Sequence, residues 1–122
     1  MTSLNGQCHC GSVKFTVTSP DGLHGLRRCD CSLCRRKGVI MATAKLPELK
    51  VTEGEDKLSL YQWNMEIAKH YFCSQCGIYT HHQRRAAPDE YGFNVACIEG
   101  IDLAALSDVP MTDGKTMSVV ED

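Results

Sequence analysis

The sequence predicts a small, mainly β domain, and two patterns support this fold class. In residues 12–18 the apolar side chains occupy every second position, which is the pattern of a half-buried strand. A Pro-Asp-Gly turn at residues 20–22 then ends this strand. Only residues 102–106 have a helical pattern, a single turn for which Asp102 is a candidate N-terminal cap.

Further strands are expected where short runs of β-branched, aromatic and other apolar residues recur along the chain. Their ranges are 39–44, 50–51, 58–61, 69–73, 78–82 and 93–98. No repeat, low-complexity tract or linker divides the 122 residues, so a single domain over 1–122 is expected. A core made of many short strands leaves a modest stability margin, which a bound metal ion would increase.

Composition and charge argue against several classes of protein. The chain carries 13 Lys and Arg residues against 15 Asp and Glu residues, a formal charge of −2, so neither nucleic acid nor an anionic membrane is expected as the main partner. Its apolar runs are far shorter than the ~20 residues of a membrane span. Residues 1–7 lack the basic and apolar stretches of a secretory signal, so a cytoplasmic location is expected.

The most informative feature of the sequence is its eight cysteines. In a reducing cytoplasm disulfides are rare, and clustered soft thiolates are preferred ligands of zinc. The C-x-x-C spacing also occurs in redox-active dithiols, an alternative that the lack of a surrounding βαβ pattern disfavours. Seven of the cysteines form three groups: Cys8 and Cys10; Cys29, Cys31 and Cys34; Cys73 and Cys76.

Two of these groups together supply four ligands. Residues i and i+2 of a strand point to the same face, so Cys8 and Cys10 are expected to reach one ion. The C-x-x-C turn of Cys73 and Cys76 adds two thiolates and completes a tetrahedron. We expect this four-cysteine site to hold a structural zinc that contributes about 10 kcal/mol or more to folding, as in zinc-finger peptides.

The remaining group, Cys29, Cys31 and Cys34, supplies three ligands from one short segment. Three protein ligands leave a fourth position open, as in catalytic zinc sites, so two zinc ions per chain are expected. The alternative is that a further side chain closes this site as well. The candidates for that role are Cys97, His24, His81 and His82.

Basic residues surround the three-cysteine segment and are offset only by Asp30. Cations beside thiolates lower the thiol pKa, compensate the negative charge of a three-thiolate zinc site and attract an anionic ligand. Arg35 and Arg36 are candidate contacts for a carboxylate, because Arg binds carboxylates in bidentate geometry. The alternative is a solvated basic loop that binds no ligand. The basic residues are Arg27, Arg28, Arg35, Arg36 and Lys37.

The cysteines occur in three motifs with specific internal spacings. These are CHCG at residues 8–11, CDCSLCRR at residues 29–36 and FCSQCG at residues 72–77. In this order they resemble the glutathione-dependent formaldehyde-activating enzyme family, which also includes centromere protein V. The similarity covers nearly the whole chain and extends to residues 93–100 and 113–114.

This resemblance implies a β-tent fold, in which small antiparallel sheets are joined by a zinc knuckle. It also implies that the four-cysteine site holds the structural zinc and that the three-cysteine site holds the second zinc. In the founding members of the family, that second zinc is associated with glutathione and formaldehyde. Many members carry His at the position of Asp30, so a role of that His in proton transfer or substrate contact would be vacant or altered in this chain.

The expected function is that of a zinc-dependent carbon-sulfur lyase, a thiol-aldehyde adduct enzyme resembling S-(hydroxymethyl)glutathione synthase. Glutathione is the first candidate substrate. Zinc bound by three thiolates is a weak Lewis acid, which favours activation of a soft thiol over activation of water. The alternative is a non-enzymatic, zinc-stapled binding module related to centromere protein V. Candidate proton-transfer groups, with an ordinary pKa of about 6.5, are His24, His70, His81 and His82.

Overall fold

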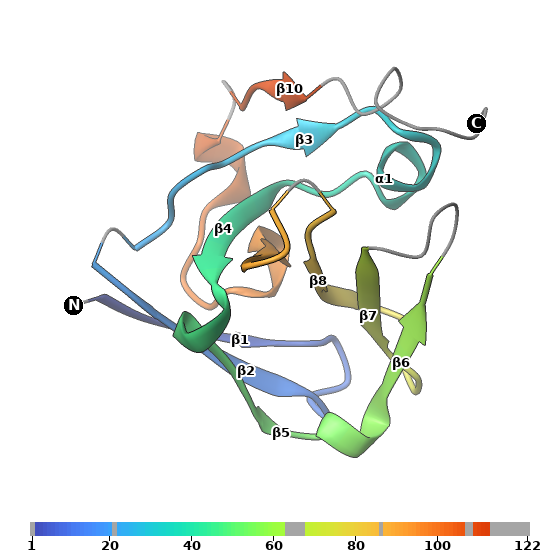
Figure 1. Ribbon diagram of the computed structural model, residues 1–122. Coiled ribbons are helices and arrows are strands. Elements are labelled where there is room, and N and C mark those ends of the chain that lie inside the picture. Colours follow the sequence, from blue (N-terminus) through green and yellow to red (C-terminus); the bar gives the residue numbers. More distant parts are fainter. Residues whose placement is uncertain (1, 21, 63–67, 86, 107–108, 113–122) are drawn as a thin grey trace.

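Two antiparallel sheets form the frame of the computed structural model, which describes residues 2–20, 22–62, 68–85, 87–106 and 109–112 (Figure 1). The smaller sheet has the strand order β1–β2–β5, and the larger has the order β4–β9–β8–β7–β6. The smaller sheet consists of β1 (Thr2–Gln7), β2 (Lys14–Ser19) and β5 (Leu49–Glu53). The larger consists of β4 (Met41–Lys45), β6 (Leu58–Tyr61), β7 (Lys69–Cys73), β8 (Tyr79–Gln83) and β9 (Glu90–Asn94). The mainly β class with antiparallel sheets is therefore confirmed.

A third, smaller unit lies at one end of the molecule. Here the two-residue strand β3 (Arg28–Cys29) pairs in parallel with β10 (Met111–Thr112), and the helix α1 (Ser32–Lys37) follows β3 directly. In Figure 1 this unit lies at the top, opposite the three-stranded sheet. The single-turn 3-10 helices are η1 (Leu46–Glu48), η2 (Glu55–Lys57), η3 (Val95–Cys97) and η4 (Leu103–Ala105).

The main core contains apolar residues from both sheets. Phe15 and Val17 from β2 belong to the same buried cluster as Ala42 from β4 and Phe93 from β9. The rings of Phe15 and Phe93 meet edge to face with 6.5 Å between their centroids. An ideal Cβ at Gly6 would lie 2.5 Å from Cζ of Phe15, so a glycine is required where β1 passes this ring.

Most of the expected strands are present. The predicted ranges 58–61 and 69–73 coincide with β6 and β7. Four others lie within two residues of the observed bounds at either end: 12–18, 39–44, 50–51 and 78–82. The capped turn is confirmed as η4, because Oδ1 of Asp102 accepts a 3.0 Å hydrogen bond from the Ala104 amide.

The predicted strand at 93–98 is wrong. Strand β9 ends at Asn94, whose side-chain oxygen accepts a 3.1 Å hydrogen bond from the Ala96 amide and caps η3. The apolar residues of this segment are buried in the core, although part of the segment is a helical turn. A short run of buried apolar residues is also typical of a strand, so the sequence pattern alone does not distinguish the two. The two longest elements that were missed are β1, whose only large apolar residue is Leu4, and α1, whose six residues have no apolar periodicity. The short elements β3, β10, η1 and η2 were not predicted either.

Candidate functional site

Four cysteine thiols meet where two turns approach each other. Cys8 and Cys10 lie in the turn between β1 and β2, Cys73 ends β7, and Cys76 lies in the turn before β8. Their sulfur atoms all lie within 4.8 Å of one another. The structure thus brings these residues together, although Cys8 and Cys10 lie in a turn and not on one face of a strand as expected.

The spacing of these sulfur atoms fits a tetrahedral zinc ion. With Zn–S bonds of about 2.3 Å, the edge of the tetrahedron is about 3.8 Å long. The distance from Sγ of Cys10 is 3.7 Å both to Sγ of Cys8 and to Sγ of Cys73. The amides of Val13 and Gln75 donate 3.4 Å hydrogen bonds to Cys8 and Cys73, an arrangement that stabilises thiolates. Within the described parts of the chain, this cluster can hold a metal ion with four protein ligands.

The second cluster is formed by a single short segment. Cys29 ends β3, Cys31 caps the N-terminus of α1, and Cys34 lies in its first turn. Their three sulfur atoms also lie within 4.8 Å of one another. Sγ of Cys31 accepts a 3.3 Å hydrogen bond from the Cys34 amide, so one contact both caps the helix and orients a ligand. Hydrogen bonds from the side chains of Cys29 and Cys34 lower the pKa of the Cys31 thiol.

Among the described residues, no fourth Cys, His, Asp or Glu side chain joins the three-cysteine cluster. Cys97, one of the candidates to close it, is buried in the main core with its thiol 3.7 Å from the carbonyl oxygen of Tyr79. His81 stacks on Tyr71 with 4.8 Å between ring centroids, and its Nδ1 lies 2.9 Å from Oγ1 of Thr80. Neither Cys97 nor His81 therefore completes this cluster.

A row of polar side chains that the sequence did not reveal as a unit lies beside this cluster. Nζ of Lys37, the last residue of α1, lies 3.2 Å from Nδ1 of His70 and 3.7 Å from the centroid of the Tyr79 ring. The Tyr79 hydroxyl in turn lies 2.5 Å from Nδ1 of His82. His70 and His82 are register partners on β7 and β8 and stack with 5.0 Å between centroids. The row thus connects α1 with the interior of the larger sheet.

The histidines in the larger sheet are neutral near pH 7. Burial, followed by the charge of Lys37, lowers the pKa of His70 to about 4. Burial alone lowers the pKa of His81 to about 4, and burial is the main cause that lowers the pKa of His82 well below its ordinary value. Each of these neutral imidazoles can therefore accept a hydrogen bond at one ring nitrogen.

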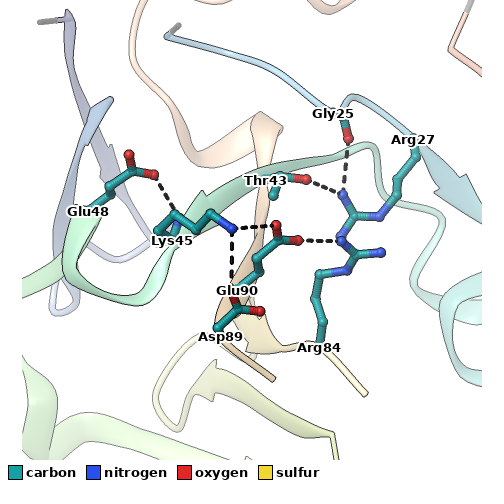
Figure 2. A network of polar contacts seen from close by, with 8 residues as sticks. All are labelled: Gly25, Arg27, Thr43, Lys45, Glu48, Arg84, Asp89 and Glu90. Atoms are coloured by element: carbon teal, nitrogen blue, oxygen red, sulfur yellow. Dashed lines mark hydrogen bonds and ion pairs between the residues drawn. The ribbon is translucent and has the colours of Figure 1, made fainter. Parts of the chain in front are cut away.

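The basic residues near the cluster point in different directions. Arg35 and Arg36 are exposed on α1, and Nη1 of Arg36 donates a 2.9 Å hydrogen bond to the carbonyl oxygen of Ser32. Lys37 is turned inward. Arg27 also points inward, where its Nη1 donates hydrogen bonds to Gly25 and Thr43 (Figure 2). Within α1, Lys37 lies three positions after Cys34, so the two residues share one face of the helix.

The inward-pointing Arg27 lies near an ion-pair network on the larger sheet (Figure 2). Nη1 of Arg84 lies 2.6 Å from a carboxylate oxygen of Glu90, whose other oxygen lies 3.2 Å from Nζ of Lys45. Lys45 also pairs with Asp89 at 3.3 Å. Burial, followed by the charge of Arg84, lowers the pKa of Arg27. The contacts of Lys45 join the end of β4 to the start of β9.

Comparison with known proteins identifies the family. A family model described as glutathione-dependent formaldehyde-activating enzyme matches residues 3–108. A protein of Halomonas elongata, provisionally named a glutathione-dependent formaldehyde-activating enzyme, is 33% identical over 81 residues, which are 60% of this chain and 51% of that protein. The chain thus spans about half the length of this curated relative.

A solved structure gives the same result for the fold. The crystal structure of a Rhodobacter sphaeroides protein has a TM-score of 0.85 and 54% sequence identity, and the match covers 88% of this chain and 99% of that chain. Among the residues described here, no helix is both long enough and apolar enough to cross a bilayer. Since the family model covers well over half of its residues, the chain belongs to the glutathione-dependent formaldehyde-activating enzyme family.

Proposed function

We propose that this chain is a zinc-dependent enzyme that adds a thiol to an aldehyde, as an S-(hydroxymethyl)glutathione synthase does. Glutathione and formaldehyde are the first candidate substrates, a choice supported by the family match and by the name of the Halomonas relative. The observation that carries the proposal is the convergence of Cys29, Cys31 and Cys34 without a fourth ligand among the described residues. A three-coordinate site of this kind has a position for a substrate.

The two cysteine clusters would have different roles. The cluster of Cys8, Cys10, Cys73 and Cys76 has four ligands and fits a structural zinc. The three-cysteine cluster would hold the second, catalytic zinc. All eight cysteines are free thiols in the structure, a state that a reducing cytoplasm maintains.

The proposed reaction needs one bond formed and one proton moved. The thiol loses its proton, its sulfur attacks the carbonyl carbon to form the carbon-sulfur bond, and the carbonyl oxygen takes up a proton to become a hydroxyl group. A zinc ion bound by the three thiolates supplies a coordination position that lowers the pKa of an incoming thiol. Atoms and charge balance without an oxidant or reductant.

The side chains around the cluster would bind the substrate and move the proton. Arg35 and Arg36 are exposed beside it and remain the candidate contacts for the carboxylates of glutathione. Of the four candidate histidines, His70 and His82 border the cluster through Lys37 and Tyr79. We therefore narrow the proton-transfer candidates to these two neutral imidazoles.

The proposal is tested by following ¹³C-labelled formaldehyde and glutathione by NMR with the zinc-loaded protein. Adduct formation is expected to exceed the spontaneous rate, and Cys31→Ser is expected to remove the excess. Cys97→Ala is the matched control, because this cysteine lies outside both clusters. If the wild-type protein binds two zinc ions but forms the adduct only at the spontaneous rate, the proposed enzymatic function is contradicted. The chain would then be a zinc-stapled binding module.

A further inference from the structure

Lys37 lies in surroundings that are unusual for a lysine. It ends α1 as the neighbour of two exposed arginines, yet its side chain turns toward the interior. Nζ lies 3.2 Å from Nδ1 of His70 and 3.7 Å above the centroid of the Tyr79 ring. Burying a charged lysine removes its hydration, which costs free energy unless nearby groups compensate for it. The neighbours of Lys37 therefore indicate how its charge is stabilised.

Both neighbours favour the charged form of the lysine. Since burial keeps the pKa of His70 at about 4, its Nδ1 is free to accept a hydrogen bond from an ammonium group near pH 7. The Tyr79 ring presents its negative face, which attracts a cation at this distance. An uncharged amine would gain less from either contact.

No carboxylate is the partner of this ammonium group in the described part of the chain. The ion pairs found there are formed by Lys14, Lys45 and Arg84. Burial lowers the pKa of Lys37, and the charges of Cys34, Cys31 and Cys29 act in the opposite direction. Geometry places the lysine beside the same group: Cys34 and Tyr79 belong to one buried cluster against which Cys29 and Cys31 pack, and Nζ of Lys37 lies over the Tyr79 ring.

The charge of Lys37 matches the charge that the three ligands would leave on a bound divalent ion, whereas the guanidinium of the other inward cation, Arg27, is hydrogen-bonded to Gly25 and Thr43. A divalent ion held by three thiolates has a net charge of minus one, and one ammonium group nearby makes the sum zero. Cys34 and Lys37 lie three residues apart on α1, so the helix itself fixes the lysine beside the ligand. Arg35 and Arg36 are exposed to water, where their charges are screened.

We propose that Lys37 is the charge-balancing residue of the three-cysteine centre, a positioning residue that sets how tightly the centre binds a divalent ion. The proposal rests on the proposed function, because it requires that the three cysteines hold zinc. It goes further by assigning the charge compensation to one inward lysine and not to the exposed arginines. A centre kept neutral in this way can accept an anionic thiolate as its fourth ligand at a smaller electrostatic cost.

The test is the zinc affinity of the Lys37→Met variant, measured with the full-length chain by competition with a chromophoric chelator. Methionine keeps the unbranched apolar stem and removes the charge. The weaker of the two zinc ions is expected to bind about ten- to a hundredfold more weakly, as found for partners that orient metal ligands, while the tighter ion is unaffected. The matched control is Lys69→Met, which removes the same charge from an exposed position next to His70.

A second readout separates charge from folding. When cobalt(II) is added to protein whose tighter site already holds zinc, the thiolate-to-metal absorption reports the occupancy of the weaker site. Lys37→Arg, which keeps the charge, is expected to restore most of the affinity. Equal affinities in Lys37→Met and Lys69→Met, or an equal loss in Lys37→Arg and Lys37→Met, would overturn the proposal. If the wild-type chain binds a single zinc ion, the proposed function fails as well, so the two failures are distinguishable.

Discussion

The two cysteine clusters use the same ligand chemistry in opposite settings. The four-cysteine cluster joins two turns, with Cys10 and Cys73 separated by 63 positions in the sequence, whereas the three-cysteine cluster is formed within one segment that contains α1. The first has a complete set of ligands, and hydrogen bonds from Ser12 lower the pKa of its Cys10 thiol. The second has three ligands, an inward lysine and a neutral histidine beside it. With the proposed roles of the two clusters, ligand number and surroundings, not ligand type, would separate a folding role from a chemical one.

The largest expected effect comes from removing a ligand of the four-cysteine cluster. Cys73→Ser removes one of four ligands between two turns, so we expect loss of cooperative folding, on the scale of the ~10 kcal/mol that structural zinc contributes. Thermal unfolding followed by circular dichroism, together with zinc analysis, measures this. Cooperative unfolding near the wild-type temperature with two zinc ions retained would contradict the structural role.

A cysteine-to-serine substitution in the three-cysteine cluster is expected to have a much smaller effect on folding. Cys31→Ser should give a folded protein with one zinc ion, because serine is itself a good N-terminal cap and can accept the Cys34 amide in place of sulfur. Its melting temperature and zinc content are the measurements. If this variant unfolds as completely as Cys73→Ser, the second zinc is structural too and the proposed enzyme loses its main support.

Some features of the fold and of the two clusters could be predicted from the sequence, and others could not. The three groups of cysteines and most strands were predicted, because ligand spacing and the alternation of apolar residues depend on a few neighbouring positions. The 93–98 segment misled because the core takes apolar side chains from a helical turn as readily as from a strand. The inward turn of Lys37 was not predictable among five basic residues, because it depends on α1 and on β7 and β8, which are distant in sequence.

Ligand binding tests whether the three-cysteine cluster has an open coordination position, as proposed. Glutathione is expected to bind zinc-loaded protein at least about tenfold more tightly than S-methylglutathione, because the methylated sulfur cannot become a thiolate ligand. Calorimetric titration of both compounds and of cysteine makes the comparison. Equal affinities would exclude direct coordination of the thiol, and no binding of any of the three at millimolar concentration would exclude glutathione as the substrate.

The smallest expected effect concerns the exposed arginines. Arg35→Ala should weaken glutathione binding about two- to fivefold at low salt and less at high salt, because a contact at an exposed guanidinium is worth about 1 kcal/mol or less and is screened. Titrations at two salt concentrations measure this. Lys50→Ala on β5, which removes an exposed charge from the other sheet, is the control, and an effect of equal size there would remove Arg35 from the binding site.

The separation of Cys10 and Cys73 also governs when each thiol becomes available during translation. At ~5–20 residues per second, a ribosome needs roughly 3 to 13 s to advance the 63 positions from the first to the second. In that interval the emerging chain already presents Cys8 and Cys10 together with the complete three-cysteine set. Zinc captured early therefore meets five thiolates that belong to two different centres. A zinc ion bound at that stage by ligands of both centres would have to exchange ligands before the four-cysteine centre is complete.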